Sequence, residues 1–239
     1  MTICFFGNYI SDYPRIRVLT QGLRENGVRV LECHTRKRGL GKYWSLFRQH
    51  WKLRNSYDVL LVGMGGQTLV WFARILCRKQ VVFDAFTSLY LTNVEDRKTC
   101  SPKSWRAGYY AALDRWSCKL ADKVLLDTNA QIDYFISRYS LPREKFFRIF
   151  VGADNKVYYP QNKISPSSKF VVHWHGHIVP FHGLNTVIAA AEALAEREDI
   201  EFQIVTRFNA KFDAVKKNAE SKSFENVRFL PEMSQEELA

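Results

Sequence analysis

The chain has 239 residues, of which 46% are hydrophobic, and its formal net charge is +11 at neutral pH. This apolar content is enough for one large domain or two smaller ones, and the lack of any run of about 18 apolar residues excludes a membrane-spanning helix. The excess of positive charge favours anionic partners: nucleic acid, an anionic membrane surface or phosphorylated ligands.

Short apolar runs alternate with amphipathic stretches in the first two thirds of the chain. The apolar runs predict strands at Thr2–Phe6, Val28–Cys33, Tyr57–Gly63, Gln80–Phe86, Asp122–Thr128 and Phe146–Gly152. The stretches between them predict helices at Arg15–Asn26, Leu40–Arg54, Gly66–Cys77, Lys103–Ala121 and Ala130–Arg138. Because strands and helices alternate and the strands are almost continuously apolar, the sequence predicts a doubly wound α/β domain with a parallel sheet.

The same pattern restarts after the polar stretch NKISPSSK, which predicts a linker at 162–169 between a domain at 1–161 and a second one at 170–239. The second part has predicted strands at Lys169–His175, Ile200–Thr206 and Val227–Leu230, and predicted helices at Gly183–Glu196 and Asn209–Ala219. An α/β domain usually needs roughly 100 to 150 residues. We therefore expect the chain to be a fragment that ends inside its second domain.

Ligands of open α/β sheets bind beyond the carboxyl ends of the strands. In the first domain this rule selects the loops Gly7–Arg15, Gly63–Gln67, Asp84–Arg97, Thr128–Asn129 and Gly152–Asp154. Asp84 ends a strand, where its carboxylate either contacts substrate hydroxyls or caps its own loop. The GMGGQT stretch lacks the lysine of a phosphate-binding P-loop, so we expect a tight turn, with direct phosphate contact as the alternative.

Four of the six histidines gather in the stretch VVHWHGHIVPFHGLN, at positions 173, 175, 177 and 182. Alternate residues of a strand share a face but lie about 6.6 Å apart, too far for three imidazoles to converge on one metal ion, so we predict no metal site. A turn at Gly176 and a helix opened by Gly183 instead favour phosphate. His177 and His182 flank that turn, with solvated histidines at a strand end as the alternative.

The basic stretch Arg36–Arg54 interleaves cations with aromatic residues. One interpretation is a helix that buries Trp44, Phe47 and Trp51 and exposes a solvated basic face. The other is an interfacial patch, in which aromatic rings sit among lipid headgroups while Lys and Arg attract anionic lipid. Nucleic acid is not an expected partner, because no recognised binding motif accompanies the charge.

Three stretches, taken in chain order, carry a resemblance to a known family. VVFDAFTSLYLTNVEDRK is similar to a stretch of a bacterial subgroup that decorates surface polysaccharides. ADKVLLDTNAQIDYF with RIFVGADNKVYYP is similar to the end of the acceptor domain, and FVVHWHGHIVPFHGLNTVIAAAEAL to the opening of the donor domain. The chain thus resembles the GT-B glycosyltransferases of the retaining family 4 type, which have two Rossmann-like doubly wound domains, the second being incomplete here.

The resemblance implies metal-independent transfer of a hexose from a nucleotide sugar to a glycan or lipid-linked acceptor, with retention and with no cofactor beyond the co-substrate. It places His177 and His182 where relatives use Arg and Lys for the donor phosphates. The expected donor site also contains Gly176, Gly183 and Arg207. Asp84 takes the catalytic place in which many relatives carry a histidine, and the expected acceptor residues are Gly7, Asn8, Arg15, Ser88 and Arg97.

The family's paired glutamates, which hold the ribose and sugar, would lie beyond Ala239, so we expect this chain alone to be inactive. The alternative is a non-catalytic, membrane-associated partner subunit of a separate glycosyltransferase chain, which the departures at His177, His182 and Arg207 also fit. The five cysteines are scattered and predict free or buried thiols, and the N-terminus has no signal-peptide pattern. We expect a cytoplasmic protein, peripheral at the inner face of the cell membrane.

Overall fold

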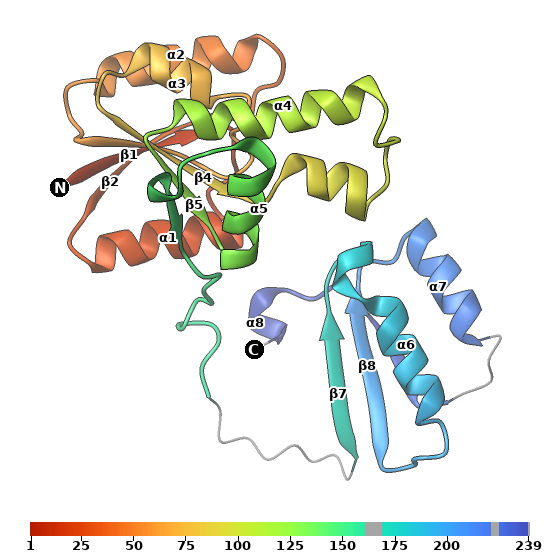
Figure 1. Cartoon of the computed structure of the whole chain (residues 1–239). Helices are drawn as coiled ribbons and strands as arrows, with labels where there is room; N and C mark the ends of the chain where they lie inside the picture. Colours follow the sequence, from red (N-terminus) through yellow and green to blue (C-terminus); the bar gives the residue numbers. More distant parts are fainter. Residues whose placement is uncertain (161–168, 221–224, 239) are drawn as a thin grey trace. The chain divides into compact units, whose positions relative to one another are not determined.

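The structure, a computed structural model, describes residues 1–160, 169–220 and 225–238 and divides into two compact units, Met1–Asp154 and Asn155–Ala239 (Figure 1). The predicted linker lies outside the described residues, apart from its last residue. Within the described ranges, no helix combines the length and the apolar composition needed to cross a membrane. All five cysteines are free, and all but Cys100 are buried, as predicted.

The first unit is built on a six-stranded parallel sheet with the strand order β2-β1-β3-β4-β5-β6. All six predicted strands are present: β1 (Thr2–Gly7), β2 (Arg29–His34), β3 (Val59–Val62), β4 (Gln80–Phe86), β5 (Lys123–Leu126) and β6 (Phe146–Arg148). The central strands are buried on both faces, which explains why they read as apolar runs without polar alternation.

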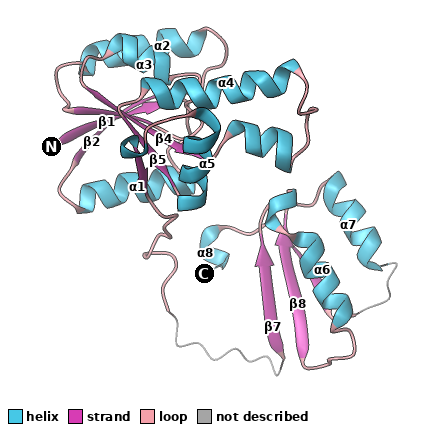
Figure 2. Ribbon diagram, in the orientation of Figure 1, coloured by secondary structure: helices cyan, strands magenta, loops and turns pink. Residues whose placement is uncertain are grey.

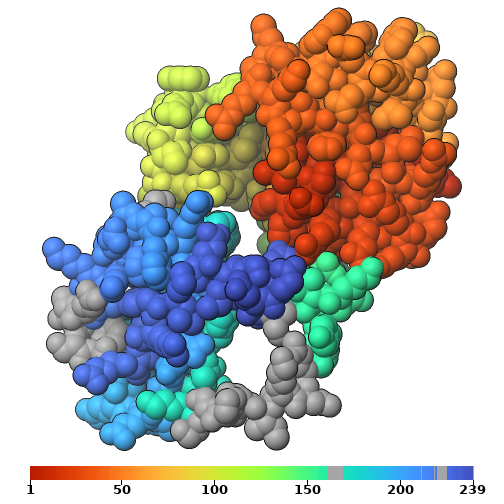
Figure 3. All heavy atoms as spheres, turned by 180° about the vertical axis from the view of Figure 1, so that it is seen from behind, coloured from red at the N-terminus to blue at the C-terminus, as the bar shows by residue number. Residues whose placement is uncertain are grey.

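Helices cover both faces of this sheet (Figure 2). They are α1 (Pro14–Glu25), α2 (Gly41–Leu53), α3 (Val70–Leu76), α4 (Trp105–Leu120) and α5 (Asn129–Tyr139). Buried residues of α2 to α5 share one hydrophobic core with one set of strand side chains, whereas Ile16 of α1 packs in the core on the opposite face. In the space-filling view, the red, orange and yellow parts of this unit lie against one another (Figure 3).

The interpretation in which the helix within Arg36–Arg54 buries its tryptophans is wrong. Trp44 and Trp51 are 63% and 55% exposed, so the helix does not bury them. It buries Leu46 and His50 instead, and the His50 ring bonds with the Tyr57 hydroxyl at 2.6 Å. Both stripes repeat at helical spacing, and the sequence offers no local reason to prefer either, so only packing against the sheet decides between them.

Helix α3 begins later than predicted, at Val70 rather than Gly66. The residues before it form the tight turn expected of the GMGGQT stretch. The Gly66 amide donates to the Gly63 carbonyl at 3.1 Å, and Gly65 has a φ of 76°, a left-handed conformation that glycine adopts readily.

The second unit has a three-stranded parallel sheet in the order β7-β8-β9, with the predicted strands at Phe170–His175, Ile200–Thr206 and Val227–Pro231. Its helices are α6 (Leu184–Ala193), α7 (Ala210–Glu220) and α8 (Gln235–Leu238). Leu184, Ile188 and Ile204 form the centre of its core. The buried Asn226 amide donates to the carbonyls of Ala191 and Leu194, which ties the end of α6 to the sheet.

Candidate functional site

Gly176 follows the last residue of β7 and is held by the neighbouring strand β8. Its amide donates to the Val205 carbonyl at 3.2 Å, and its own carbonyl accepts from the Thr206 hydroxyl at 2.8 Å. Its φ is 153°, and a Cβ at this position would lie 3.1 Å from Nδ1 of His182. Glycine is therefore the residue that fits this turn both in backbone conformation and in space.

His182 is held against the same turn by a hydrogen bond with the carbonyl oxygen of His177 at 2.7 Å. A carbonyl oxygen only accepts, so Nδ1 of His182 carries the proton, and Nε2 is the ring nitrogen that can meet a ligand. In the neutral ring Nε2 is an acceptor. It becomes a donor, which a phosphate oxygen requires, only when the ring is protonated.

A pocket of about 380 Å³ opens at the carboxyl ends of β7 and β8. This volume falls within the range of small-molecule sites. Its lining comes from the segment after β7 and from the segment that joins β8 to α7, and it includes two predicted donor residues, His177 and Arg207. The lining residues are His177, Ile178, Val179, Thr206, Arg207, Asn209 and Ala210. Three of the predicted donor residues therefore lie close together in the fold. His177 and Arg207 line the pocket, and His182 forms a hydrogen bond with His177.

Arg207 and the start of α7 are the electropositive elements of this pocket. Arg207 forms an ion pair with Glu232 at 3.7 Å, and both side chains are more than half exposed, so the pair restrains Arg207 only weakly. Asn209 caps α7 by accepting from the Phe212 amide. The first amides of an α-helix carry partial positive charge, so the wall at Ala210 also favours an anion.

The strand histidines lie on one face of β7, as predicted. The ring centroids of His173 and His175 are 5.3 Å apart. Burial, and after it the neighbouring His175, lowers the pKa of His173. Among the described residues, no group of three or more His, Cys, Asp or Glu side chains is arranged to hold a metal ion.

In the first unit, Asp84 and Arg15 form a buried ion pair. Nε and Nη2 of Arg15 donate to the two carboxylate oxygens at 2.9 and 2.6 Å, and Asp84 has no exposed surface. Burial raises the pKa of Asp84, and the two hydrogen bonds from Arg15 oppose that rise. Because both oxygens are occupied, Asp84 positions Arg15 in this structure, and its catalytic assignment stays a prediction.

Arg15 lines a second, smaller pocket at the carboxyl edge of the first sheet. Its guanidinium carbon lies 4.3 Å from the ring centroid of Phe86, which has a φ of 58° beside a register shift in β4. The pocket holds about 160 Å³ and brings Arg15 and Phe86 next to Gly152. Each of these three residues belongs to a different loop that the sequence selected, so three of those loops meet at one place.

Gly7 and Asn8 lie at the end of β1. A Cβ on Gly7 would come within 2.9 Å of the Tyr9 ring, so glycine here makes room for that buried side chain. The Asn8 amide donates to the Lys37 carbonyl at 3.0 Å. Arg97 is exposed and follows the π-helical turn η1 (Leu91–Asp96). The structure does not place these three with Arg15 in one pocket, and their acceptor contacts stay predictions.

Ser88 is fully buried and belongs to a hydrogen-bond network that no sequence motif predicted. Its hydroxyl donates to Asp114 of α4 at 2.6 Å, and Asp114 also accepts from the amides of Leu89 and Tyr90. Burial raises the pKa of Asp114, while these hydrogen bonds oppose the rise. The sequence did contain one sign of this network: Asp114 lies at helical spacing from Ala107 and Cys118, so an acidic residue falls on the buried face of α4.

Comparisons with known proteins identify the fold. No protein-family model matches the chain, and no curated protein matches its sequence. Among solved structures, the Anabaena protein Alr3699/HepE, in complex with UDP and glucose, is 17% identical with a TM-score of 0.60, over 98% of this chain and 70% of that chain. Sucrose-phosphate synthase from Thermosynechococcus elongatus is 12% identical with a TM-score of 0.68, over 100% and 72%. UDP-GlcNAc 2-epimerase from Neisseria meningitidis, bound to UDP-GlcNAc, is 12% identical with a TM-score of 0.58, over 98% and 73%.

These likenesses define the class: the chain has the α/β fold of the GT-B type, with two Rossmann-like units on parallel sheets. The predicted fold class is confirmed. Because a synthase and an epimerase both match it, the fold by itself does not choose the reaction.

Removing Arg15 should destabilise the first unit strongly. In Arg15→Leu the buried Asp84 carboxylate loses its partner, and we expect the free energy of unfolding to fall by about 3–5 kcal/mol, measured by urea denaturation. Adding Asp84→Asn removes the unpaired charge and should restore a large part of this loss. Equal stability of the single and double variants would contradict a paired, buried carboxylate.

Asp114→Asn should loosen the loop after β4. The new amide group turns a donor toward the donors of Ser88, Leu89 and Tyr90, and we expect a loss of about 2–3 kcal/mol in the free energy of unfolding. Ser88→Ala removes one hydrogen bond and should cost about 1 kcal/mol. Amide hydrogen exchange at Leu89 and Tyr90 should speed up in Asp114→Asn, and unchanged protection there would contradict the network.

Proposed function

We propose that this chain carries the nucleotide-sugar site and the acceptor side of a glycosyltransferase, which moves a hexose to a glycan or lipid-linked acceptor. The observation that carries the proposal is the pocket at the carboxyl ends of β7 and β8, where His177 and Arg207 meet the start of α7. A diphosphate is the anion for which a cation, an imidazole and helix amides provide matching charge and donors. UDP is the first probe, because the HepE structure contains UDP and glucose.

In the proposed reaction, the bond between the anomeric carbon and the diphosphate oxygen breaks, and its electron pair leaves with the diphosphate. The acceptor hydroxyl oxygen bonds to the anomeric carbon on the same face, and its proton passes to a diphosphate oxygen, so configuration is retained. The chain's contribution is electrostatic: Arg207, protonated His182 and the start of α7 stabilise the charge that develops on the leaving group.

We propose that this transfer needs no metal ion, because these cationic groups take over the neutralisation of the diphosphate. Addition of EDTA should then leave the affinity for UDP unchanged. On the acceptor side, Arg15 is the proposed contact, held by Asp84 and by the Phe86 ring. Ser88 acts there through the loop that it ties to Asp114 rather than through its hydroxyl.

Calorimetric titration with UDP-glucose tests the donor site. Loss of one charge-assisted hydrogen bond should weaken binding about tenfold in His182→Ala and in Arg207→Ala. The matched control is His173→Ala, which removes an exposed histidine of β7. Its side chain neither lines the pocket nor, unlike that of His182, has a hydrogen bond with a lining residue. Wild-type affinity in both site variants would remove this pocket from the donor site.

Product analysis separates the reactions that the fold permits. Transfer releases UDP and attaches the sugar to the acceptor, whereas epimerisation returns a nucleotide sugar of changed configuration. Binding of UDP-glucose with neither outcome would favour the non-catalytic partner subunit. In that case His177, His182 and Arg207 would mark a donor site that differs from that of active relatives.

A further inference from the structure

Tryptophan is unusually exposed in the first unit. Five of the chain's six tryptophans, together with one isoleucine and one tyrosine, lie on the outer sides of α2, α3 and α4. Their exposed fractions are 63% for Trp44, 55% for Trp51, 44% for Trp71, 72% for Ile75, 80% for Trp105, 50% for Tyr109 and 51% for Trp116. Large apolar groups that gather on one surface, rather than lie scattered, mark an interaction site.

The three helices are neighbours on one side of the sheet. Helix α3 contacts both α2 and α4, and the buried faces of all three share one core (Figure 1). The Tyr43 hydroxyl donates to the Thr68 carbonyl at 3.1 Å, and its ring lies 5.6 Å from that of Trp71, which joins α2 to α3. Because each helix turns its core stripe toward the sheet, the exposed residues point away from it. We call these seven exposed residues, together with the partly buried Phe47 between Trp44 and Trp51, the aromatic face: Trp44, Phe47, Trp51, Trp71, Ile75, Trp105, Tyr109 and Trp116.

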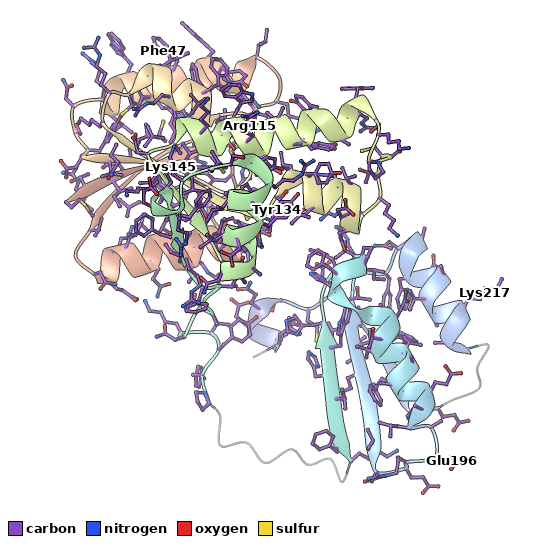
Figure 4. The ribbon with its side chains drawn as sticks, viewed as in Figure 1. Phe47, Arg115, Tyr134, Lys145, Glu196 and Lys217 are labelled. Carbon is purple, nitrogen blue, oxygen red and sulfur yellow. The ribbon has the colours of Figure 1, made fainter. Side chains whose placement is uncertain are left out.

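The aromatic rings of α2 form a row along the helix. Phe47 lies between Trp44 and Trp51, with ring centroids 5.7 and 5.8 Å apart, and the Arg54 guanidinium lies 4.1 Å from the Trp51 centroid. On α4, the Lys119 amine lies 4.8 Å from the ring centroid of Trp116. Figure 4 shows Phe47 on α2 and Arg115 on α4, both in this layer of helices. Such aromatic rows flanked by cations suit a boundary between apolar and anionic surroundings.

The segment that contains α2 and α3 is strongly positive. Between Arg36 and Phe83 the chain contains ten Lys and Arg residues and one acidic residue, Asp58, which accepts from the Thr2 amide at 2.7 Å. Positive charge at this density attracts an anionic surface and repels a second copy of the same face.

A cavity of about 400 Å³ adjoins the aromatic face between α4 and α5. Its lining combines one tryptophan of the face with two arginines and small residues: Ala111, Ala112, Arg115, Trp116, Arg138, Tyr139 and Ser140. Two guanidinium groups beside an indole ring provide donors for a phosphate group and an apolar wall for the chain attached to it.

We propose that the aromatic face docks on the surface of an anionic phospholipid bilayer. The tryptophan and tyrosine rings lie at the level of the headgroups, the Lys and Arg residues contact lipid phosphates, and the cavity at Arg115 and Arg138 holds one headgroup. Proteins that bind single-stranded nucleic acid stack bases in a groove. Here the rings project from the outer sides of helices, which favours a broad, flat partner.

Flotation with lipid vesicles tests the docking. The chain should float with vesicles of phosphatidylcholine containing about 30% phosphatidylglycerol, and not with pure phosphatidylcholine, and salt should weaken this binding. Tryptophan fluorescence should shift to shorter wavelength on binding. No nucleotide sugar is present, so the result is independent of the donor-site titrations.

Two variant pairs separate this face from general properties of the chain. Trp44→Ala with Trp51→Ala should weaken vesicle binding about tenfold or more, since each removed ring takes apolar area out of the interface. Tyr159→Ala with Phe170→Ala removes two exposed aromatic residues of the second unit and should change nothing. Arg48→Glu with Lys52→Glu should also weaken binding about tenfold or more, whereas Lys217→Glu with Arg228→Glu, which changes the net charge equally, should have little effect.

Equal thermal unfolding of all variants shows that exposed positions were changed without loss of the fold. The proposal is overturned if vesicle binding is absent, if it is the same with neutral lipid, or if the control pairs weaken it as much as the test pairs. It is also overturned if the substitutions on α2 instead abolish a dimer seen by analytical ultracentrifugation, or abolish binding of a single-stranded oligonucleotide, with no vesicle binding in the parent chain.

Discussion

Every strand in both units runs parallel to its neighbours, and this constraint decides where chemistry can occur. A parallel sheet gathers the carboxyl ends of its strands at one edge, and each following helix begins there with unpaired amides. Residues from distant parts of the chain therefore meet at that edge. Arg15, Phe86 and Gly152 come together in the first unit, and His177, Thr206 and Arg207 in the second.

Several polar groups at these edges are held by hydrogen bonds with other groups of the protein. Arg15 is fixed by Asp84, the loop at Ser88 by Asp114, and His182 by the carbonyl of His177. Each of these contacts fixes the orientation of a side chain or loop in the absence of a ligand, which lowers the entropic cost of ordering it when a ligand binds. In the second unit it also fixes the tautomer of His182, because a carbonyl oxygen can only accept a hydrogen bond.

The helical layer over the first sheet faces two different environments. Its inner side packs Leu46, Ala73 and Cys118 against the strands. Its outer side carries exposed aromatic rings next to cations, which an ordinary solvated helix surface does not need. An enzyme with a lipid-linked acceptor would gain from such a surface, because docking confines it to the plane in which the acceptor diffuses. The donor site and the docking face thus support one proposed function from independent residues.

Local pattern in the sequence determined the strands, their order of alternation with helices, the class of the fold and the loops that lie at the carboxyl edges. Apolar runs and turn residues are properties of neighbouring positions, so they can be recognised without the fold.

The choice between two stripes on α2 was different: the stripe of Trp44 and Trp51 and that of Leu46 and His50 both have helical spacing, and only packing against the sheet buried the second. Asp84 was singled out as a strand-end carboxylate, yet its partner Arg15 lies 69 positions away, and Asp114 acts on a loop 24 to 26 positions before it. Burial and long-range pairing are set by tertiary packing, because no local signal in a sequence says which distant side chain will fill the space beside a residue.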